Sequence, residues 1–320
     1  GGLEPVGPYL AQSTVIQEAD FYGQTIEAFR QDGQLWCVPQ NASSLVVYYN
    51  RDLFDAAGVP YPRAEWTWDD FLAAAKALTR DLDGDGRIDQ YGAGIDAELY
   101  RLAPLIWQQG GDLVDDPAQP SRLALDSPAA QAAFQWFVDL QTVAHVVPDA
   151  VAESAESSAS RFLNGRLAMV FNSRRVAPTY RASAAFAWDV APLPRSLQPA
   201  NILHSDGYCL AASSKHKPAA WKFIEFANSE QGQALMAATG RTVPSLRAVA
   251  ESPAFLDPQQ APANSRVYID AIPFLRHVPI MAAWPGIEDT ASKEIERAFY
   301  GQASVEEAAA AAIELTRPFF

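Results

Sequence analysis

Short apolar runs of strand length alternate with helical segments along this chain, and this alternation constrains the fold more than any other feature. The runs are rich in β-branched and aromatic residues, which favour strands. They lie at residues 35–39, 45–49, 167–171, 188–192 and 208–212. Strands that alternate with helices predict an α/β architecture in which helices cover the sheets. A chain of 320 residues is too long for one small core, so we expect two lobes.

Capping side chains and apolar residues at a 3.6-residue period mark the helices. The predicted helix starts are Asn50 before residues 51–57, Thr67 with Asp70 in capping-box spacing, Ser127, Pro218, Ser229 and Ser304 with Glu307. A further helix is predicted over residues 287–298. Segments 152–160 and 252–263 are rich in Ser, Glu and Ala or in Pro and Gln, and this composition predicts loops.

The charge balance and the apolar pattern exclude several classes of protein. The formal net charge is -14 and the sequence pI is about 4.7. We expect no nucleic acid partner, because the phosphate backbone recruits lysine and arginine. No apolar run reaches the roughly 18 residues that a membrane-spanning helix needs. The sequence therefore predicts a protein without a membrane span.

Catalytic motifs are absent from the sequence. It contains no G-x-S-x-G elbow, no P-loop and no G-x-G-x-x-G, and its four histidines lack metal-ligand spacing. A glycoside hydrolase needs two carboxylates set across the scissile bond. Glu98, Asp112 and Asp206 are available acids, but no pair stands out at strand ends. We therefore expect a protein that is not an enzyme, with a glycoside hydrolase as the less favoured alternative.

Six motifs in a fixed order carry a family resemblance over residues 31–315. They are QDGQLWCVPQNASSLVVYYNRDLF (31–54), WTWDDF (66–71), GGD (110–112), NGRLAMVF (164–171), SKHK (214–217) and GRTVPS (240–245). Each motif alone is weakly specific, but their common order with comparable gaps is specific. In this order they resemble the extracellular solute-binding proteins of ABC sugar importers, the maltose-binding-protein-like group.

The resemblance implies a type II periplasmic-binding-protein-like fold, with two α/β lobes joined by hinge strands and ligand in the cleft between them. Carried onto this chain, the N-terminal lobe comprises residues 1–44 and 206–270, and the C-terminal lobe comprises residues 45–205 and 271–320. Family members usually carry a further N-terminal stretch, so we expect the first lobe to be incomplete at its start.

The function that the resemblance implies is capture of a sugar or oligosaccharide and its delivery to an ABC transporter permease in the membrane. Closure of the lobes would bury the ligand, and no cofactor would be required. The expected protein is a monomer in the periplasm or outside the cell, with a lipoprotein anchor as a further expectation. A ligand-binding input protein for a sensory receptor is the alternative that the sequence leaves open.

A sugar site needs aromatic rings for stacking and polar side chains for hydrogen bonds. The candidate ligand-binding residues are Ser43, Ser44, Glu98, Tyr100, Asn172, Arg175, Asp206, Tyr208, Arg241 and Trp284. Each has a plainer explanation, such as a turn, an exposed helix start or core packing. Relatives often have an aromatic residue near Arg175, so this arginine either selects a carboxylate or phosphate ligand or lies on the surface.

The acidic loop 81–89 matches the start of an EF-hand-type calcium loop. Its candidate ligands are Asp81, Asp83, Asp85, the backbone carbonyl of Arg87, and Asp89. Position 12 of the pattern is Gly92, where a bidentate glutamate is expected. A structural Ca²⁺ site and an aspartate-rich turn without an ion both fit this sequence.

The two cysteines, Cys37 and Cys209, lie on predicted strands that lead into hinge crossings. These strands are neighbours in the sheet that the resemblance implies, so a disulfide is one interpretation. Two buried free thiols are the other, and we favour the free thiols.

Overall fold

A computed structural model describes residues 2–320 and divides the chain into two compact units. Unit 1 comprises Gly1–Leu45, Ser173–Arg181 and Leu203–Ile280, and unit 2 comprises Val46–Asn172, Ala182–Ile202 and Met281–Phe320. Compared with the predicted lobes, unit 1 also contains Leu45 and Ser173–Arg181, and the later boundaries fall at 202/203 and 280/281. Each unit combines strands and helices, as the alternating pattern predicts.

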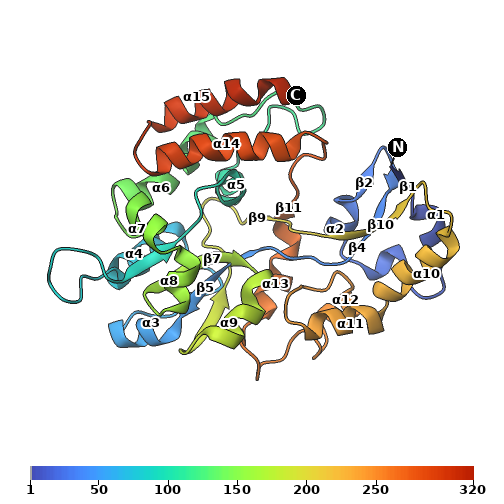
Figure 1. The fold of residues 1–320 in the computed structure, drawn as a ribbon, viewed down its shortest axis with the longest axis horizontal. Helices are drawn as coiled ribbons and strands as arrows, with labels where there is room; N and C mark the ends of the chain where they lie inside the picture. Colours follow the sequence, from blue (N-terminus) through green and yellow to red (C-terminus); the bar gives the residue numbers. More distant parts are fainter. Residues whose placement is uncertain (1) are drawn as a thin grey trace. The chain divides into compact units, whose positions relative to one another are not determined.

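Unit 1 is built on a small antiparallel sheet of strand order β1-β10-β4. Its strands are β1 (Leu3–Glu4), β2 (Arg30–Gln31), β3 (Gln34–Leu35), β4 (Cys37–Pro39), β10 (Gly207–Ala211) and β11 (Leu275–Arg276). Its helices are α1 (Gly7–Leu10), α2 (Gly23–Glu27), α10 (Lys217–Ala227), α11 (Glu230–Ala238), α12 (Arg247–Ala250) and α13 (Arg266–Asp270). Figure 1 shows α10 beside β10, so this helix packs on the sheet.

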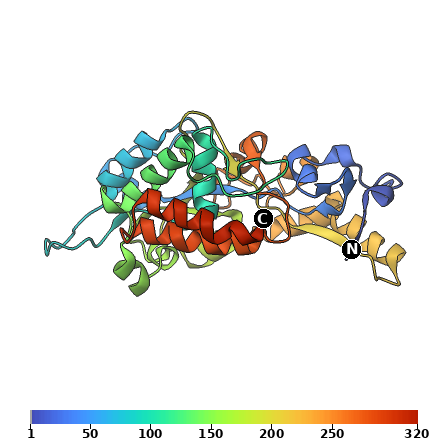
Figure 2. The same ribbon diagram turned by 90° about the horizontal axis from the view of Figure 1, so that it is seen from above.

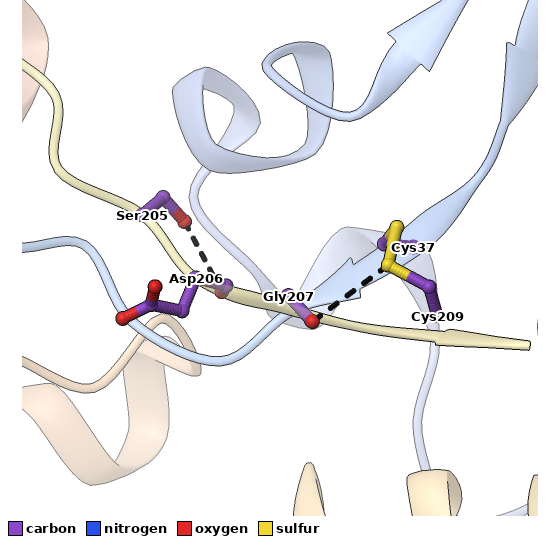
Figure 3. The surroundings of a disulfide bond; sticks show 5 residues. All are labelled: Cys37, Ser205, Asp206, Gly207 and Cys209. Carbon is purple, nitrogen blue, oxygen red and sulfur yellow. Dashed lines mark hydrogen bonds between the residues drawn. A yellow bond between two sulfur atoms is a disulfide. The ribbon is translucent and has the colours of Figure 1, made fainter. Parts of the chain in front are cut away.

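Cys37 and Cys209 form a disulfide within unit 1 (Figure 3). β4 and β10 run antiparallel, and their register places the two cysteines directly opposite each other, with 4.3 Å between their Cα atoms. The expectation of two buried free thiols is therefore wrong. Cys37 is buried but Cys209 is exposed. The strand register decides the bond, and composition alone does not contain that register.

Unit 2 contains a four-stranded sheet of order β6-β7-β5-β8, with β6 parallel to β7 and β5 antiparallel to β8. Its strands are β5 (Leu45–Asn50), β6 (Tyr91–Gly94), β7 (Leu167–Ser173), β8 (Trp188–Ala191) and β9 (Asn201–Ile202). Its helices are α3 (Arg51–Ala57), α4 (Trp68–Leu78), α5 (Leu99–Gln108), α6 (Pro128–Thr142), α7 (Ala150–Ala155), α8 (Ser158–Leu163), α14 (Trp284–Phe299) and α15 (Val305–Thr316). In Figures 1 and 2, α14 and α15 run side by side, and both also contact α6.

Helix α9 (Ala177–Ser183) crosses the boundary between the units along the chain. The segment before it belongs to unit 1 because Arg174 is buried there. The Arg174 guanidinium donates hydrogen bonds to the Gly240 carbonyl and the Ser265 Oγ, each at 2.9 Å. It also lies 4.9 Å from the centre of the Phe255 ring. These contacts hold Ser173–Arg181 in unit 1.

The predicted helix starts are confirmed where a side chain caps the first turn. Asn50 accepts a hydrogen bond from the Leu53 amide, and Gly58 ends α3 in the left-handed conformation. Capping boxes open α4 at Thr67 and α15 at Ser304. Such caps satisfy amide groups that the helix leaves without partners, so the local sequence is sufficient to predict them.

The prediction of a loop over residues 152–160 is wrong, because two short helices, α7 and α8, cover most of it. Asp149 caps α7 and Ser157 caps α8, each by accepting an amide hydrogen bond. The serines that indicated a loop instead include a helix cap. Segment 252–263 contains turns and no regular helix or strand.

The core of unit 2 contains large aromatic side chains that are almost fully buried, among them Trp107, Phe134, Phe137 and Phe299. Among residues 2–320, no helix has the length and apolar character needed to cross a membrane. The acidic and basic residues of unit 1 are equal in number, so the whole formal net charge of -14 lies on unit 2.

Candidate ligand-binding site

The ten predicted ligand-binding residues divide between the units. Glu98, Tyr100, Asn172 and Trp284 belong to unit 2, and the other six belong to unit 1. The unit 2 candidates Glu98, Tyr100 and Trp284 lie on two helices that pack together, α5 and α14. We name the polar side chains at the starts of these helices (Glu98, Arg101, Trp284 and Glu288) the unit 2 cluster.

The start of α5 is held against α14 by a hydrogen bond from the Leu99 amide to the Ser292 Oγ, at 3.0 Å. Ser292 therefore satisfies an amide of the first turn, a task that a capping side chain usually performs. Glu98 is the N-cap residue of α5, but its side chain makes no capping hydrogen bond. Glu98 is exposed as a residue, so its carboxylate is available to a ligand, although the surrounding protein partly desolvates this carboxylate and raises its pKa.

Trp284 is the first residue of α14, and Glu288 follows one helical turn later. Residues four positions apart lie on the same face of a helix. Trp284 is only 5% exposed, and its indole N–H has no hydrogen-bond partner of good geometry among the described residues. The indole interacts with the Glu288 carboxylate and lowers its pKa. Trp284 thus directs a buried donor toward a carboxylate that is partly exposed.

The electrostatics of the cluster disfavour two ionised glutamates. Burial raises the pKa of Glu98, and the negative charges of Asp96 and Glu296 raise it further. Burial also raises the pKa of Glu288, as does the charge of Glu98. Arg101 lowers both pKa values, but its guanidinium already makes an ion pair with Asp96 at 2.7 Å.

Tyr100 contributes an aromatic ring next to this group, with the Arg101 guanidinium 5.5 Å from the ring centre. No sequence motif singles out Asp96 or Arg101, and Glu288 is likewise not among the predicted site residues. For Glu288 a signal was present, because it lies four residues after Trp284 on a predicted helix. The approach of Glu288 to Glu98 depends on the packing of α14 on α5, which the sequence alone did not supply.

In unit 1, most of the predicted hinge residues have partners. The Asp206 carboxylate accepts a hydrogen bond from the Asn41 Nδ2 at 3.0 Å. The Tyr208 hydroxyl accepts one from the Gln40 Nε2 at 3.4 Å, and the Ser43 carbonyl accepts one from the His204 amide at 2.7 Å. These groups therefore contribute to the local structure of unit 1.

The remaining candidates have different environments. Ser44 is fully buried, and its Oγ has no hydrogen-bond partner among residues 2–320. Arg175 and Arg241 are exposed. Asn172 is partly exposed near the end of β7.

The acidic loop 81–89 projects from unit 2 (Figures 1 and 2). Ligand atoms of Asp81, Asp83 and Asp89 lie within 4.8 Å of one another. Asp81 accepts amide hydrogen bonds from Gly84 at 2.7 Å and Gly86 at 2.9 Å, and these bonds lower its pKa. Three of the predicted oxygen ligands therefore come together. Asp85 is not part of this group, and its carboxylate accepts from the Arg87 amide at 2.8 Å.

The structure thus combines two α/β units with a cluster of carboxylates and aromatic rings at the starts of two helices of unit 2. The pattern of the family of bacterial extracellular solute-binding proteins matches residues 1–234. The chain belongs to this family.

Relatives of known sequence and structure agree with this assignment. A binding protein of Brucella abortus (strain 2308) is 24% identical over 314 residues, which cover 94% of this chain and 71% of that protein. The ABC substrate-binding protein Lmo0181 from Listeria monocytogenes, solved with cycloalternan, is 24% identical and has a TM-score of 0.88 over 99% of this chain and 80% of its own. The maltose/maltodextrin-binding domain MalE from Bdellovibrio bacteriovorus, solved with maltotriose, is 20% identical and has a TM-score of 0.77 over 99% and 80%. The predicted type II periplasmic-binding-protein-like fold is confirmed by these structures.

Proposed function

We propose that this protein is the substrate-binding component of an ABC importer and that it binds a sugar or oligosaccharide outside the cytoplasm. The observation that carries the proposal is the unit 2 cluster. It combines the carboxylates of Glu98 and Glu288 with the Trp284 indole donor and the Tyr100 ring. Sugar hydroxyls donate to carboxylates, and the apolar faces of sugar rings pack on aromatic rings.

The similar proteins support a carbohydrate ligand, since Lmo0181 and the Bdellovibrio MalE domain were solved with cycloalternan and maltotriose. Both relatives are binding proteins, which supports a function without catalysis. Delivery to a membrane permease, a monomeric state and a lipoprotein anchor are further parts of the proposal. Closure of two lobes on the ligand stays a prediction from the family resemblance.

The first test is a fluorescence titration with mono-, di- and oligosaccharides. Six of the eight tryptophans, Trp284 among them, belong to unit 2, so binding at the cluster is expected to change the emission. The panel includes sn-glycerol 3-phosphate, because an 80-residue stretch of this chain is 32% identical to the sn-glycerol-3-phosphate-binding periplasmic protein UgpB of Agrobacterium fabrum. This phosphate also tests whether the exposed Arg175 binds an anion.

A saturable response at micromolar sugar, with the sugar recovered unchanged, would support the proposal. The Trp284→Ala variant should then bind more weakly by about 1–3 kcal/mol, the range for a buried aromatic contact. Affinity equal to that of the parent protein would remove Trp284 from the site. Conversion of a sugar to product would contradict the assignment as a binding protein.

A further inference from the structure

The unit 2 cluster has more negative charge than its own cations balance. The carboxylates of Asp96, Glu98, Glu288 and Glu296 act on one another electrostatically. Arg101 is the cation that acts on Glu98 and Glu288, and it is already paired with Asp96 at 2.7 Å. The basic residues further along α14 are paired elsewhere, Lys293 with Asp289 and Arg297 with Glu294. Glu98 and Glu288 therefore share the charge of Arg101 with Asp96.

A second observation is independent of these charges. Trp284 is only 5% exposed, and its indole N–H has no hydrogen-bond partner of good geometry among the described residues. A buried donor without a partner is unfavourable, because the folded protein does not replace the hydrogen bond that this donor makes to water in the unfolded chain. A ligand that carries an acceptor for this N–H and donors for the two carboxylates would give the indole a partner and would also stabilise the excess negative charge.

Neutral sugars and amino sugars differ in how well they meet this requirement. A hydroxyl group donates one hydrogen bond and leaves the charge of the paired carboxylates unchanged. An ammonium group donates three hydrogen bonds and supplies a positive charge, and hydrogen bonds between ionised groups are roughly twice as strong as those between neutral groups. The ring oxygens and hydroxyls of the same sugar provide acceptors for the indole N–H.

From this geometry we propose that the natural ligand is an amino-substituted carbohydrate whose ammonium group binds between Glu98 and Glu288, beside the Trp284 indole. The inference rests on the proposed function, because it specifies the class of sugar that the same site selects. The net charge of unit 2, which carries the whole -14 of the chain, also favours a cationic ligand through long-range attraction.

The proposal implies a pH dependence. Burial raises the pKa of Glu98 and of Glu288, with Asp96 and Glu296 adding to the effect at Glu98 and Arg101 opposing it at both. A cation binds best when both carboxyls are ionised. Affinity for an amino sugar should therefore increase as the pH rises through the raised pKa values of this pair, and affinity for a neutral sugar should change less.

The experiment compares two matched pairs of ligands by isothermal titration calorimetry at neutral pH. Chitosan trisaccharide is compared with cellotriose, and 6-amino-6-deoxymaltose with maltose, because each pair differs in the amino substitution. The variants are Glu288→Gln and Glu98→Gln, which keep the shape of the side chain and remove its charge. The control is Asp289→Asn, a neighbour on the same helix whose carboxylate is exposed and paired with Lys293 at 2.7 Å.

We expect at least one amino sugar to bind at least tenfold more tightly than its neutral counterpart. This preference should be lost in Glu288→Gln and Glu98→Gln and retained in Asp289→Asn, with thermal unfolding showing that all variants fold. Neutral sugars that bind as tightly as their amino counterparts, or a preference that survives Glu288→Gln, would overturn the inference and leave the proposed function intact. Absence of binding by every sugar would overturn both.

Discussion

Removing the Cys37–Cys209 disulfide should destabilise the protein by an amount that the chain connectivity determines. The bond joins residues that are 172 positions apart in the sequence. In the chain-entropy model, opening a loop of this length raises the conformational entropy of the unfolded state, at a cost to stability of about 5 kcal/mol at 25 °C. Measured effects are usually smaller than this limit, so we expect a loss of about 3–5 kcal/mol for the Cys37→Ala/Cys209→Ala variant.

Urea unfolding followed by circular dichroism provides the measurement. The double variant should unfold at a lower urea concentration than the oxidised parent, and its m-value should rise because the unfolded chain is no longer cross-linked. The loss should appear in the transition that unfolds unit 1, since both cysteines lie there. Parent protein reduced with a phosphine serves as a control that keeps both sulfur atoms, so it separates loss of the cross-link from loss of packing.

Two results would refute this reasoning. Two thiols that react in the denatured, unreduced protein would show that the bond is absent. An unchanged unfolding midpoint in both the double variant and the reduced parent would show that the cross-link is present but does not limit the unfolded state.

Three further predictions concern other parts of the chain. In Gly92→Ala the new Cβ would lie 1.9 Å from the Ala75 carbonyl oxygen, so we expect the free energy of unfolding in urea to fall by at least about 2 kcal/mol. The control Gly23→Ala, with open space around its Cβ, should change this free energy by less than about 1 kcal/mol. Burial lowers the pKa of His204 from 6.5 to about 3, so between these pH values the unfolded state binds a proton that the folded state does not. The free energy of unfolding should therefore fall as the pH drops from 6.5 toward 3, by at most about 5 kcal/mol. His204→Gln should make this decline shallower, and equal pH profiles of the free energy of unfolding would contradict it. If the acidic loop 81–89 holds Ca²⁺, calcium should raise the melting temperature in a saturable manner and magnesium should not; identical melting curves with calcium and with chelator would favour the aspartate-rich turn without an ion.

Features that depend on neighbouring residues could be predicted from the sequence. The N-caps at Asn50, Thr67 and Ser304 and the glycine end of α3 were predictable because each hydrogen bond spans only a few positions. The alternation of strands and helices and the ordered motifs were sufficient for the fold class and the family. The short helices over residues 150–163 were missed because serine and aspartate are common both in loops and at helix caps.

Features that join distant parts of the chain depend on the tertiary structure. The antiparallel register of β4 and β10 places Cys37 opposite Cys209, and the packing of α5 on α14 brings Glu98 toward Glu288. The burial of Arg174 assigns Ser173–Arg181 to unit 1. Each depends on which surfaces pack together, and hydrophobic patterns specify which face of an element is buried without specifying its partner.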